Sequence, residues 1–506
     1  MPSLRLLCPF IVACAFFGSS ASALASPVLV MGRDGSVHRR NDAALPSADS
    51  PLAELPALRD GLVAAAAGRG PLASAAATTT TPRLRRAAAK AVDRSLAQLL
   101  RTRAIDATDY AGYSRTFDDA VATAARLGGS RGAAIQSVLN NTADMARDGA
   151  LTAPRLPAAF LTLSRNTEWW KTGKLLSYGE RVEFNDSELV WEYYPGEGIQ
   201  LQVLGTFGKA NGLWMSKDRT HLRALLDEMT GVASTRGGAL AWEYYFFFGG
   251  GTPPWASGMA QATGAQVLAR ASQLLDDPSY LATARQAIRI FQLPAPTGVG
   301  VRTTAGRRFL LYSFAPSQQV LNAFIQTLVA LNDYNAIARD PRAAALFKAG
   351  EAQARLDLRA TDTGAWSLYQ VGGSEAPLSY QQLVTGFLTN LCDRTRESYW
   401  CSAGTRFTSY LRTPPAIELL TRSALGGSQS LVRFTVSKES KVGMTITRDG
   451  STALSTSATV SHGPHGYAWH VPRSPGVYTV TLSGTDLAGN FGRVSATITV
   501  TGRARV

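Results

Sequence analysis

Two tyrosines flank a glycine-containing loop in the second half of the sequence, and they are the first candidates for chemistry. The stretch runs from Asp362 to Leu391, with Tyr369 before the loop and Tyr380 after it, where a helical pattern begins. Loops held by a rigid scaffold often carry binding and catalytic groups. The alternative is a packed ring whose hydroxyl has found a partner, which is the commoner role of such a tyrosine.

Aromatic and acidic residues are dense in this sequence, and the richest segment is Ala241–Trp255, AWEYYFFFGGGTPPW. Aromatic rings stack well on the faces of sugars, so we expect Trp255, beside its glycine and proline loop, to bind substrate. We expect residues 246–248, which are all phenylalanine, to lie in the core. Glu197 and Glu243 are candidate acids for substrate binding, although each could instead be a salt-bridged or exposed carboxylate.

The residue types that several other chemistries need are sparse. The chain has five histidines, and it carries neither an H-E-x-x-H pair nor a glycine-rich nucleotide loop. Metal-dependent hydrolysis and phosphoryl transfer therefore have no sequence support. Gly128–Gly132 matches G-x-S-x-G, but it lies between helical patterns and does not follow a strand, so we interpret it as a loop. The sequence predicts neither a metal nor a cofactor.

The chain is basic, with 51 lysines and arginines against 37 acidic residues and a formal charge of +14. This dispersed excess favours an anionic partner such as an acidic polysaccharide, or it is an ordinary solvated surface. No nucleic-acid-binding motif is present, so nucleic acid is not the expected partner.

The N-terminus has the pattern of a secretory signal peptide, with Arg5, an apolar run from Leu6 to Phe17 and an Ala-Leu-Ala cleavage site ending at Ala25. No other stretch is long and apolar enough to span a bilayer. We therefore expect a secreted protein without a transmembrane segment. Cys392 and Cys401 remain after cleavage, and in an oxidising compartment this isolated pair predicts a structural disulfide.

Composition and periodicity divide the 506 residues into five parts. The second part is rich in Ala, Pro, Ser and Thr and predicts a disordered spacer. The third is helical, the fourth begins with strand patterns and continues as amphipathic helices, and the fifth has short alternating strands between turns. The predicted parts are a signal peptide (1–25), a spacer (26–81), an N-terminal helical region (82–155), a helical domain (156–412) and a C-terminal all-β domain (413–506).

The whole pattern predicts a multidomain, mainly α protein. The connections between helices carry Gly, Pro or Asp, which favours helical hairpins closed into an (α/α) toroid after a small β-rich entry segment. Periodicity alone does not separate a toroid from an open solenoid. The short C-terminal strands favour an immunoglobulin- or fibronectin-like sandwich. The best-defined helical patterns cover residues 258–275, 280–291, 319–337, 342–359 and 380–392.

Three sequence blocks resemble the C-terminal helical domain of the D-glucuronyl C5-epimerase family. Pro253–Gln261, PPWASGMAQ, resembles the family's P-x-W-x-S-x-M-A-Q. Tyr312–Phe324, YSFAPSQQVLNAF, resembles its Y-P-x-x-P…V-L-N-G-F block. Asp362–Tyr369, followed by Tyr380, resembles its D-T-G…Y…Y block. The three blocks occur in the family's order and at similar spacing.

This resemblance implies that Tyr312, Tyr369 and Tyr380 fall on the family's active-site tyrosines. It also makes Gln261 and Asn322, which lie inside the matching blocks, candidate substrate-binding residues. The implied function is a secreted uronate C5-epimerase acting on glucuronic acid residues of an anionic, heparosan-like polysaccharide. Such a reaction needs an acid/base group on each face of the sugar and a group that neutralises the uronate carboxylate.

Two other functions stay open on the residues alone. A polysaccharide lyase would begin with the same removal of the C5 proton and would then eliminate the 4-linked substituent. A catalytically silent protein would bind glycan through Trp255 and the C-terminal sandwich.

Overall fold

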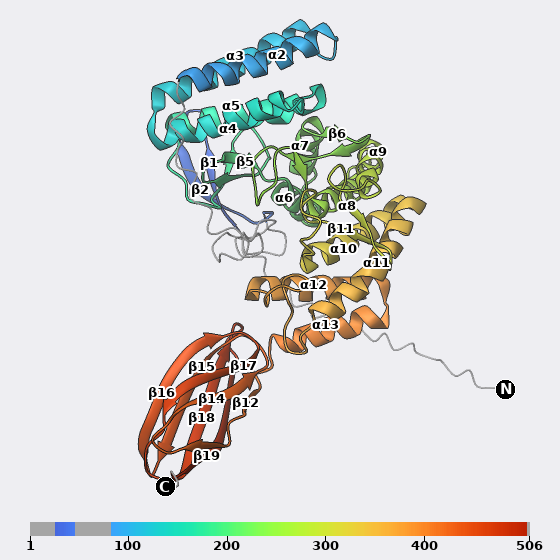
Figure 1. The fold of residues 1–506 in the computed structure, drawn as a ribbon. Helices are drawn as coiled ribbons and strands as arrows, with labels where there is room; N and C mark the ends of the chain where they lie inside the picture. The colour runs from blue at the N-terminus through green and yellow to red at the C-terminus, as the bar shows by residue number, and fades with distance from the viewer. Residues whose placement is uncertain (1–25, 46–81, 503–506) are drawn as a thin grey trace, which may run out of the picture.

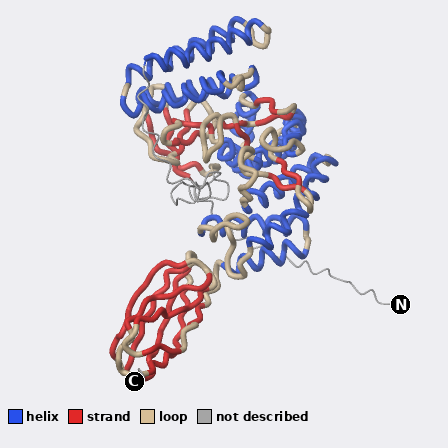
Figure 2. Tube along the Cα trace, in the orientation of Figure 1, coloured by secondary structure: helices blue, strands red, loops and turns tan. Residues whose placement is uncertain are grey.

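The structure of the protein is a computed structural model that describes residues 26–45 and 82–502. The predicted signal peptide and residues 46–81 of the predicted spacer lie outside the described residues. Long helices form one end of the described chain, a mixed part follows, and a β-rich part forms the other end (Figure 1, Figure 2). The prediction of a mainly α protein with a β-rich C-terminus is confirmed. No described helix is long and apolar enough to cross a membrane.

Long helices form the first layer of the structure (Figure 1). Asp106 begins the second of them, because its side chain accepts a hydrogen bond from the backbone of Asp109 at 2.8 Å. The Gly128–Gly132 string lies at the next helix junction and not after a strand. The helices are α2 (Pro82–Arg101), α3 (Ala107–Leu127), α4 (Gly129–Arg147) and α5 (Leu156–Thr172), with the short 3-10 helix η2 (Ala153–Arg155) before α5.

A five-stranded sheet of order β2-β1-β3-β4-β5 contains a segment that we expected to be disordered. β1 and β2 form an antiparallel hairpin, and β1 pairs in parallel with β3. The spacer prediction is wrong for this segment because residues 28–31 are apolar and fully buried, so the segment has a hydrophobic face to cover. The strands are β1 (Ser26–Met31), β2 (Val37–Asp42), β3 (Arg181–Phe184), β4 (Trp191–Tyr194) and β5 (Gly198–Leu201).

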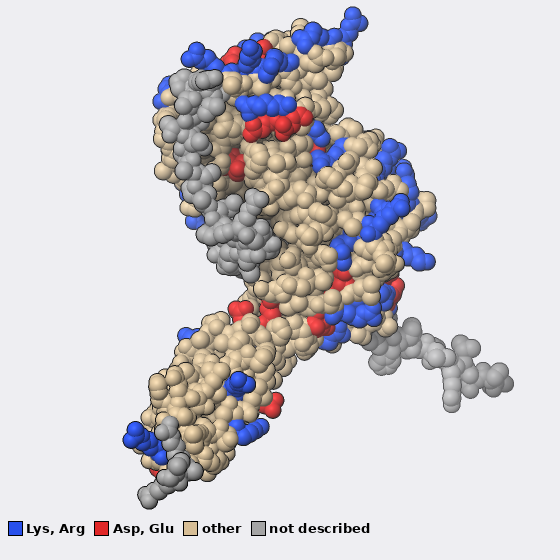
Figure 3. All heavy atoms as spheres, viewed as in Figure 1, with Lys and Arg blue, Asp and Glu red and all other residues tan. Residues whose placement is uncertain are grey.

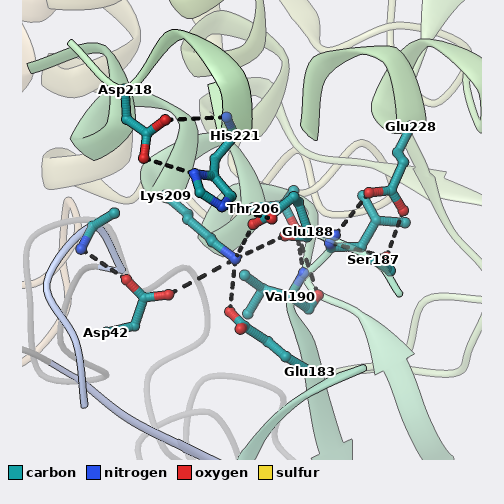
Figure 4. Close-up of polar contacts among 12 residues, drawn as sticks. Asp42, Glu183, Ser187, Glu188, Val190, Thr206, Lys209, Asp218, His221 and Glu228 are labelled. Atoms are coloured by element: carbon teal, nitrogen blue, oxygen red, sulfur yellow. Dashed lines mark hydrogen bonds and ion pairs between the residues drawn. The ribbon is translucent and has the colours of Figure 1, made fainter. Parts of the chain in front are cut away.

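Charged contacts join this hairpin to the helix that follows the sheet, α6 (Val203–Ser216) (Figure 4). The buried ammonium of Lys209 lies 3.0 Å from Glu183, 2.8 Å from Glu188 and 3.8 Å from Asp42 of β2. Burial alone would lower the pKa of Lys209, but the carboxylates raise it above its ordinary value. Because a buried charge is strongly destabilising without partners, this network holds β2 against the helical part.

The remaining helices pack in two rows. In the first row, α6, α8, α10 and α12 each contact the next helix of the row. In the second row, α7, α9, α11 and α13 each pack against the first-row helix that precedes them in the sequence. Closure of these rows into a toroid stays a prediction. The helices after α6 are α7 (Arg219–Gly231), α8 (Gly258–Leu274), α9 (Pro278–Ala287), η3 (Ile288–Phe291), α10 (Leu321–Ala338), α11 (Pro341–Thr361), α12 (Leu378–Thr395) and α13 (Ser398–Tyr410).

Short strand pairs and one disulfide support the helix rows. Cys392 of α12 and Cys401 of α13 form a disulfide, with their Cα atoms 4.6 Å apart. The strand pairs lie in the connections between α7 and α8 and between η3 and α10. They are β6 (Ser234–Arg236) with β7 (Ala239–Ala241), β8 (Glu243–Tyr244) with β9 (Trp255–Ala256), and β10 (Gly300–Arg302) with β11 (Arg307–Phe309).

The C-terminal part has two sheets, of order β12-β14-β17 and β13-β19-β18-β15-β16. Alternate residues of their strands are buried in one shared core that includes Phe434, Trp469 and Ile498. Its assignment as immunoglobulin-like stays a prediction. The strands are β12 (Ile417–Leu419), β13 (Ser423–Leu425), β14 (Gln429–Val436), β15 (Ser440–Arg448), β16 (Ser451–Val460), β17 (Gly463–His470), β18 (Gly476–Asp486) and β19 (Phe491–Thr501).

Candidate active site

Tyr312 lies in the loop between β11 and α10, where an aromatic cluster surrounds its buried ring. Its ring centre is 5.6 Å from Phe248 and 5.7 Å from Trp255. Phe314 stacks on it at 5.5 Å, with an angle of 14° between the planes. Aromatic rings in such contacts have few alternative positions. The cluster therefore fixes where Tyr312 lies.

Trp255 belongs to the same cluster and is only 1% exposed. Its indole stacks on Tyr244 at 4.2 Å, and its Nε1 donates a hydrogen bond to the carbonyl of Phe246 at 2.8 Å. The prediction that this ring stacks on sugar is wrong, because neighbouring rings already cover it. In this structure Trp255 packs against the ring of Tyr312 and helps to hold it in place.

Tyr369 lies in the loop before α12 and Tyr380 in the first turn of α12, with their ring centres 5.0 Å apart. The backbone of Tyr369 accepts a hydrogen bond from Leu321 at the start of α10, at 3.2 Å. The loops that carry Tyr312 and Tyr369 therefore meet at this helix end. Burial raises the pKa of Tyr369, and the hydrogen bond with Tyr380 lowers it in part. Tyr369 consequently keeps its proton at neutral pH.

Glu197 is a half-buried carboxylate in the turn between β4 and β5. Its Oε2 accepts hydrogen bonds from Asn141 Nδ2 at 2.9 Å and from the backbone N–H of Phe247 at 3.3 Å. No lysine or arginine of the described chain forms an ion pair with it. Burial raises the pKa of Glu197 to about 7. Because the next residue, Phe248, packs on Tyr312, Glu197 lies at the same end of the helix rows as the aromatic cluster.

Glu243 has a different environment, and its side chain is fully buried. Arg155 binds it with two nitrogens at 2.7 and 3.0 Å. Arg236 lies 2.6 Å from its Oε1, and the hydroxyl of Ser234 donates to its Oε2 at 2.6 Å. The salt-bridged alternative is therefore the one observed. The substrate-binding prediction for Glu243 is wrong, because its oxygens are enclosed and already paired.

Gln261 and Asn322 lie in the first turns of α8 and α10. Gln261 is 0% exposed and donates from Nε2 to the carbonyl of Trp242 at 2.8 Å. Asn322 is 7% exposed and accepts from the backbone of Ala323 at 2.8 Å. Gln261 is enclosed in this structure, and its role in substrate binding stays a prediction. Asn322 contributes to the helix start on which the tyrosine loops meet.

The loop that carries Tyr369 also contacts the C-terminal β part. The buried carboxylate of Glu375 accepts hydrogen bonds from the backbone of Glu439 at 2.7 Å and of His462 at 3.1 Å. The ammonium of Lys438 lies 5.2 Å from the centre of the Trp366 ring. These contacts hold the loop from the side opposite to the helix rows. The sequence gives no signal for them, because the partners are 64 and 87 positions apart.

The described residues thus supply tyrosine hydroxyls and a carboxyl group that titrates near neutral pH. These are groups that can move a proton to or from a bound substrate. Within residues 26–45 and 82–502, no group of three or more His, Cys, Asp or Glu side chains could hold a metal ion.

Sequence comparison shows that the part of the chain that carries the three tyrosines is similar to a family of carbohydrate epimerases. Residues 236–409 match the model of the family described as D-glucuronyl C5-epimerase C-terminus. A D-glucuronyl C5-epimerase from Caenorhabditis elegans is 31% identical over 133 residues, which are 24% of this chain and 21% of that protein. The chain therefore matches about a fifth of the length of this relative. The family resemblance stated from the sequence is confirmed.

Similarity to solved structures is weak. An endo-beta-1,4-glucanase from Acetobacter xylinum is 11% identical, and the match covers 40% of this chain and 72% of that chain with a TM-score of 0.28. An engineered protein is 13% identical, and the match covers 48% of this chain and 45% of that chain with a TM-score of 0.15. Scores this low support no argument about fold or activity.

Proposed function

We propose that the protein is a uronate C5-epimerase that acts on glucuronic acid residues of an anionic polysaccharide. The observation that carries the proposal is the contact between Tyr369 and Tyr380, at 5.0 Å, inside the range that matches the epimerase family. The net positive charge of the chain suits an anionic polymer.

The chemistry needs few groups. The C5–H bond breaks, its electron pair is delocalised into the neighbouring carboxylate, and a new C5–H bond forms on the opposite face. No other bond changes, so a base on one face and an acid on the other are sufficient. A positively charged group near the carboxylate stabilises the intermediate, because negative charge accumulates there.

In this proposal Tyr369 is the acid, since its raised pKa keeps it protonated at neutral pH. Glu197 is the candidate base, because a carboxyl group with a pKa of about 7 is about half ionised at neutral pH and can accept a proton. Tyr380 supplies a second hydroxyl group beside Tyr369, and Tyr312 lies buried in the aromatic cluster at this end of the helix rows.

We also propose how the protein is built and where it acts. The two helix rows are the wall of an (α/α) toroid, and the two C-terminal sheets are an immunoglobulin-like sandwich. Residues 1–25 direct export, so that the enzyme meets its polymer outside the cell.

Proton exchange in deuterated water tests this function. We expect deuterium at C5 of heparosan, with inversion and without chain cleavage, when the purified protein and polymer are followed by NMR. Replacement of Tyr369 or Tyr380 by Phe should lower the exchange rate by about 100-fold or more, the usual contribution of an acid/base group. Tyr110→Phe is the matched control, because its hydroxyl bonds to Asp93 in the N-terminal helices.

Two results would contradict the proposal. A new absorbing double bond with chain cleavage would show a lyase. Binding without exchange across a panel of uronate polymers would show a glycan-binding protein.

A further inference from the structure

A cleft of about 650 Å³ lies beside the loop that carries Tyr312. The hairpin β10-β11 forms one wall of this cleft through Arg302 and Arg307, and Ser313 and Phe314 form another. A volume of this size accommodates a sugar unit. The mechanism proposed above does not use the cleft.

The cleft carries positive charge that the protein does not balance. Arg302 and Arg307 are directly paired across the hairpin, so their side chains leave the same face of the two strands. None of the residues that line the cleft is acidic. Burial lowers the pKa of Arg307, and the charge of Arg302 lowers it further. Like charges held opposite each other are destabilising unless an anion lies between or beside them.

The neighbouring arginine shows what a balanced charge looks like in this hairpin. Arg308 points to the other face and binds both oxygens of Asp357, at 2.7 and 2.6 Å. Arg307 instead donates from Nη1 to the carbonyls of Phe291 and Gln292, at 2.8 and 3.0 Å. Its Nε and Nη2 form no bond within the described chain. Arg307 therefore has a fixed position and keeps donors for a ligand.

An aromatic wall makes the cleft suitable for a sugar as well as for an anion. Phe314 is half-buried, lines the cleft and stacks on Tyr312 at 5.5 Å. A ring in this position can cover the apolar face of a pyranose while guanidinium groups bind its oxyanion. On the face drawn in Figure 3, basic side chains gather along the edge around α9 and β11, with few acidic ones among them.

We propose that Arg302, Arg307 and Phe314 form a subsite for an anionic sugar unit of the polymer other than the unit that reacts. The ligand is a pyranose that carries a carboxylate or a sulfate. The inference rests on the proposed function, because it assigns a second unit of the same polymer to a place beside Tyr312. It predicts that a polymer of several units binds better than a single uronate.

Calorimetric titration of the full chain with a heparosan hexasaccharide tests this subsite. Arg302→Ala and Arg307→Ala should each weaken binding by about 10-fold or more, the usual effect of losing a hydrogen bond between charged groups. Arg307→Lys keeps the charge but not the two-nitrogen geometry, so we expect partial recovery. Arg219→Ala, an exposed arginine in α7, is the control and should leave the affinity unchanged.

Two further probes identify the chemistry of the ligand. Heparosan hexasaccharide with its carboxylates reduced to alcohols should bind weakly and with no dependence on Arg302 or Arg307. Sodium sulfate alone should bind much more weakly than the hexasaccharide. Equal binding of sulfate, or of the reduced sugar, would overturn the subsite. An equal loss of affinity in Arg219→Ala would also overturn it, because the effect would then be one of overall charge.

The exchange assay separates failure of the subsite from failure of the proposed function. Exchange at C5 by wild type with unchanged binding and turnover in the arginine variants would refute the subsite and leave the epimerase in place. Arginine-dependent binding without any exchange would refute the epimerase and leave the anionic sugar site. Urea unfolding of each variant verifies that a loss of binding does not reflect a loss of folding.

Discussion

Glu243 lies in the segment of residues 243–248 and the half-buried Glu197 contacts it, but the two carboxylates have opposite electrostatic environments. Glu243 is enclosed by Arg155 and Arg236, whereas Glu197 accepts hydrogen bonds from the neutral donors of Asn141 and Phe247. A cation beside a buried carboxylate offsets the loss of its hydration, and neutral donors offset it only in part. Burial alone therefore does not tell a structural acid from one that can exchange protons.

The two carboxylates also show how a site can sit beside a rigid support. The ion cluster of Glu243 joins three elements, because Arg155 lies in η2, Arg236 in β6 and Glu243 in β8. Arg155 and Glu243 are 88 positions apart in the sequence. Glu197 contacts Phe247 of the same segment, and burial raises its pKa to about 7. Perturbed carboxyl groups of this kind are frequent at functional sites. Three substitutions test this contrast.

The largest effect should come from Glu243→Ala. Removing this carboxylate leaves two buried arginines without their anion, and the loss of unfolding free energy should be about 3–5 kcal/mol. Urea unfolding at neutral pH measures the loss. Glu168→Ala is the control, because Glu168 is 40% exposed and pairs with Arg165 at the surface, where an ion pair contributes about 1 kcal/mol or less. Equal losses in the two variants would remove the distinction between the clusters.

Glu197→Gln should have an intermediate effect that depends on pH. The carboxyl group of Glu197 has a higher pKa in the folded protein, about 7, than its ordinary value of 4.5. Protonation of Glu197 therefore stabilises the folded protein. This contribution to the free energy of unfolding is fully present below about pH 4.5 and is lost as the pH rises through about 7. The variant does not titrate, so its stability relative to wild type should increase by up to about 3 kcal/mol between pH 4.5 and 8.

Urea unfolding of both proteins at several pH values measures this difference. The amide oxygen of Gln can accept the bonds from Asn141 and Phe247, so the variant keeps the local contacts. A stability difference that stays constant from pH 4.5 to 8 would show that Glu197 titrates normally.

The smallest effect should come from Asn141→Ala, which removes one donor to Glu197. The hydrogen bond lowers the pKa of Glu197, so its loss should move the titration midpoint upward from about 7. The carboxyl carbon chemical shift of Glu197, followed by NMR, reports this midpoint. Asn140→Ala is the matched control on the same helix, since Asn140 bonds to Gln136. A shift of similar size in both variants would mean that the effect is not transmitted through the hydrogen bond.

Periodicity predicted the helix rows closely. The patterns at 258–275, 319–337 and 342–359 correspond to α8, α10 and α11 with small differences at their ends. Amphipathic repeats identify such helices because the apolar residues of the buried face recur at helical spacing. The sequence blocks also indicated the family whose model matches residues 236–409.

The burial of individual site residues could not be predicted in the same way. Trp255 is covered by Tyr244 and Tyr312, and Glu243 is paired by Arg155, so each environment depends on residues distant in sequence. The strand β1 was missed because its apolar run is short and lies next to a segment rich in Ala, Pro and Ser. The pKa of Glu197 likewise follows from packing that no motif encodes.

The position of Lys438 has a consequence for how the molecule unfolds. Its ammonium is 2.8 Å from Asp486 within the β part, but it also donates to the carbonyls of Tyr410 and Thr413 at 2.7 and 2.6 Å. Separating the β part from the helices would break these bonds and expose the Trp366 ring. Unfolding of the β part should therefore also destabilise the helical part, because these contacts are lost. The boundary predicted at residue 413 separates two sequence patterns, but the parts of the protein on either side of it stabilise each other.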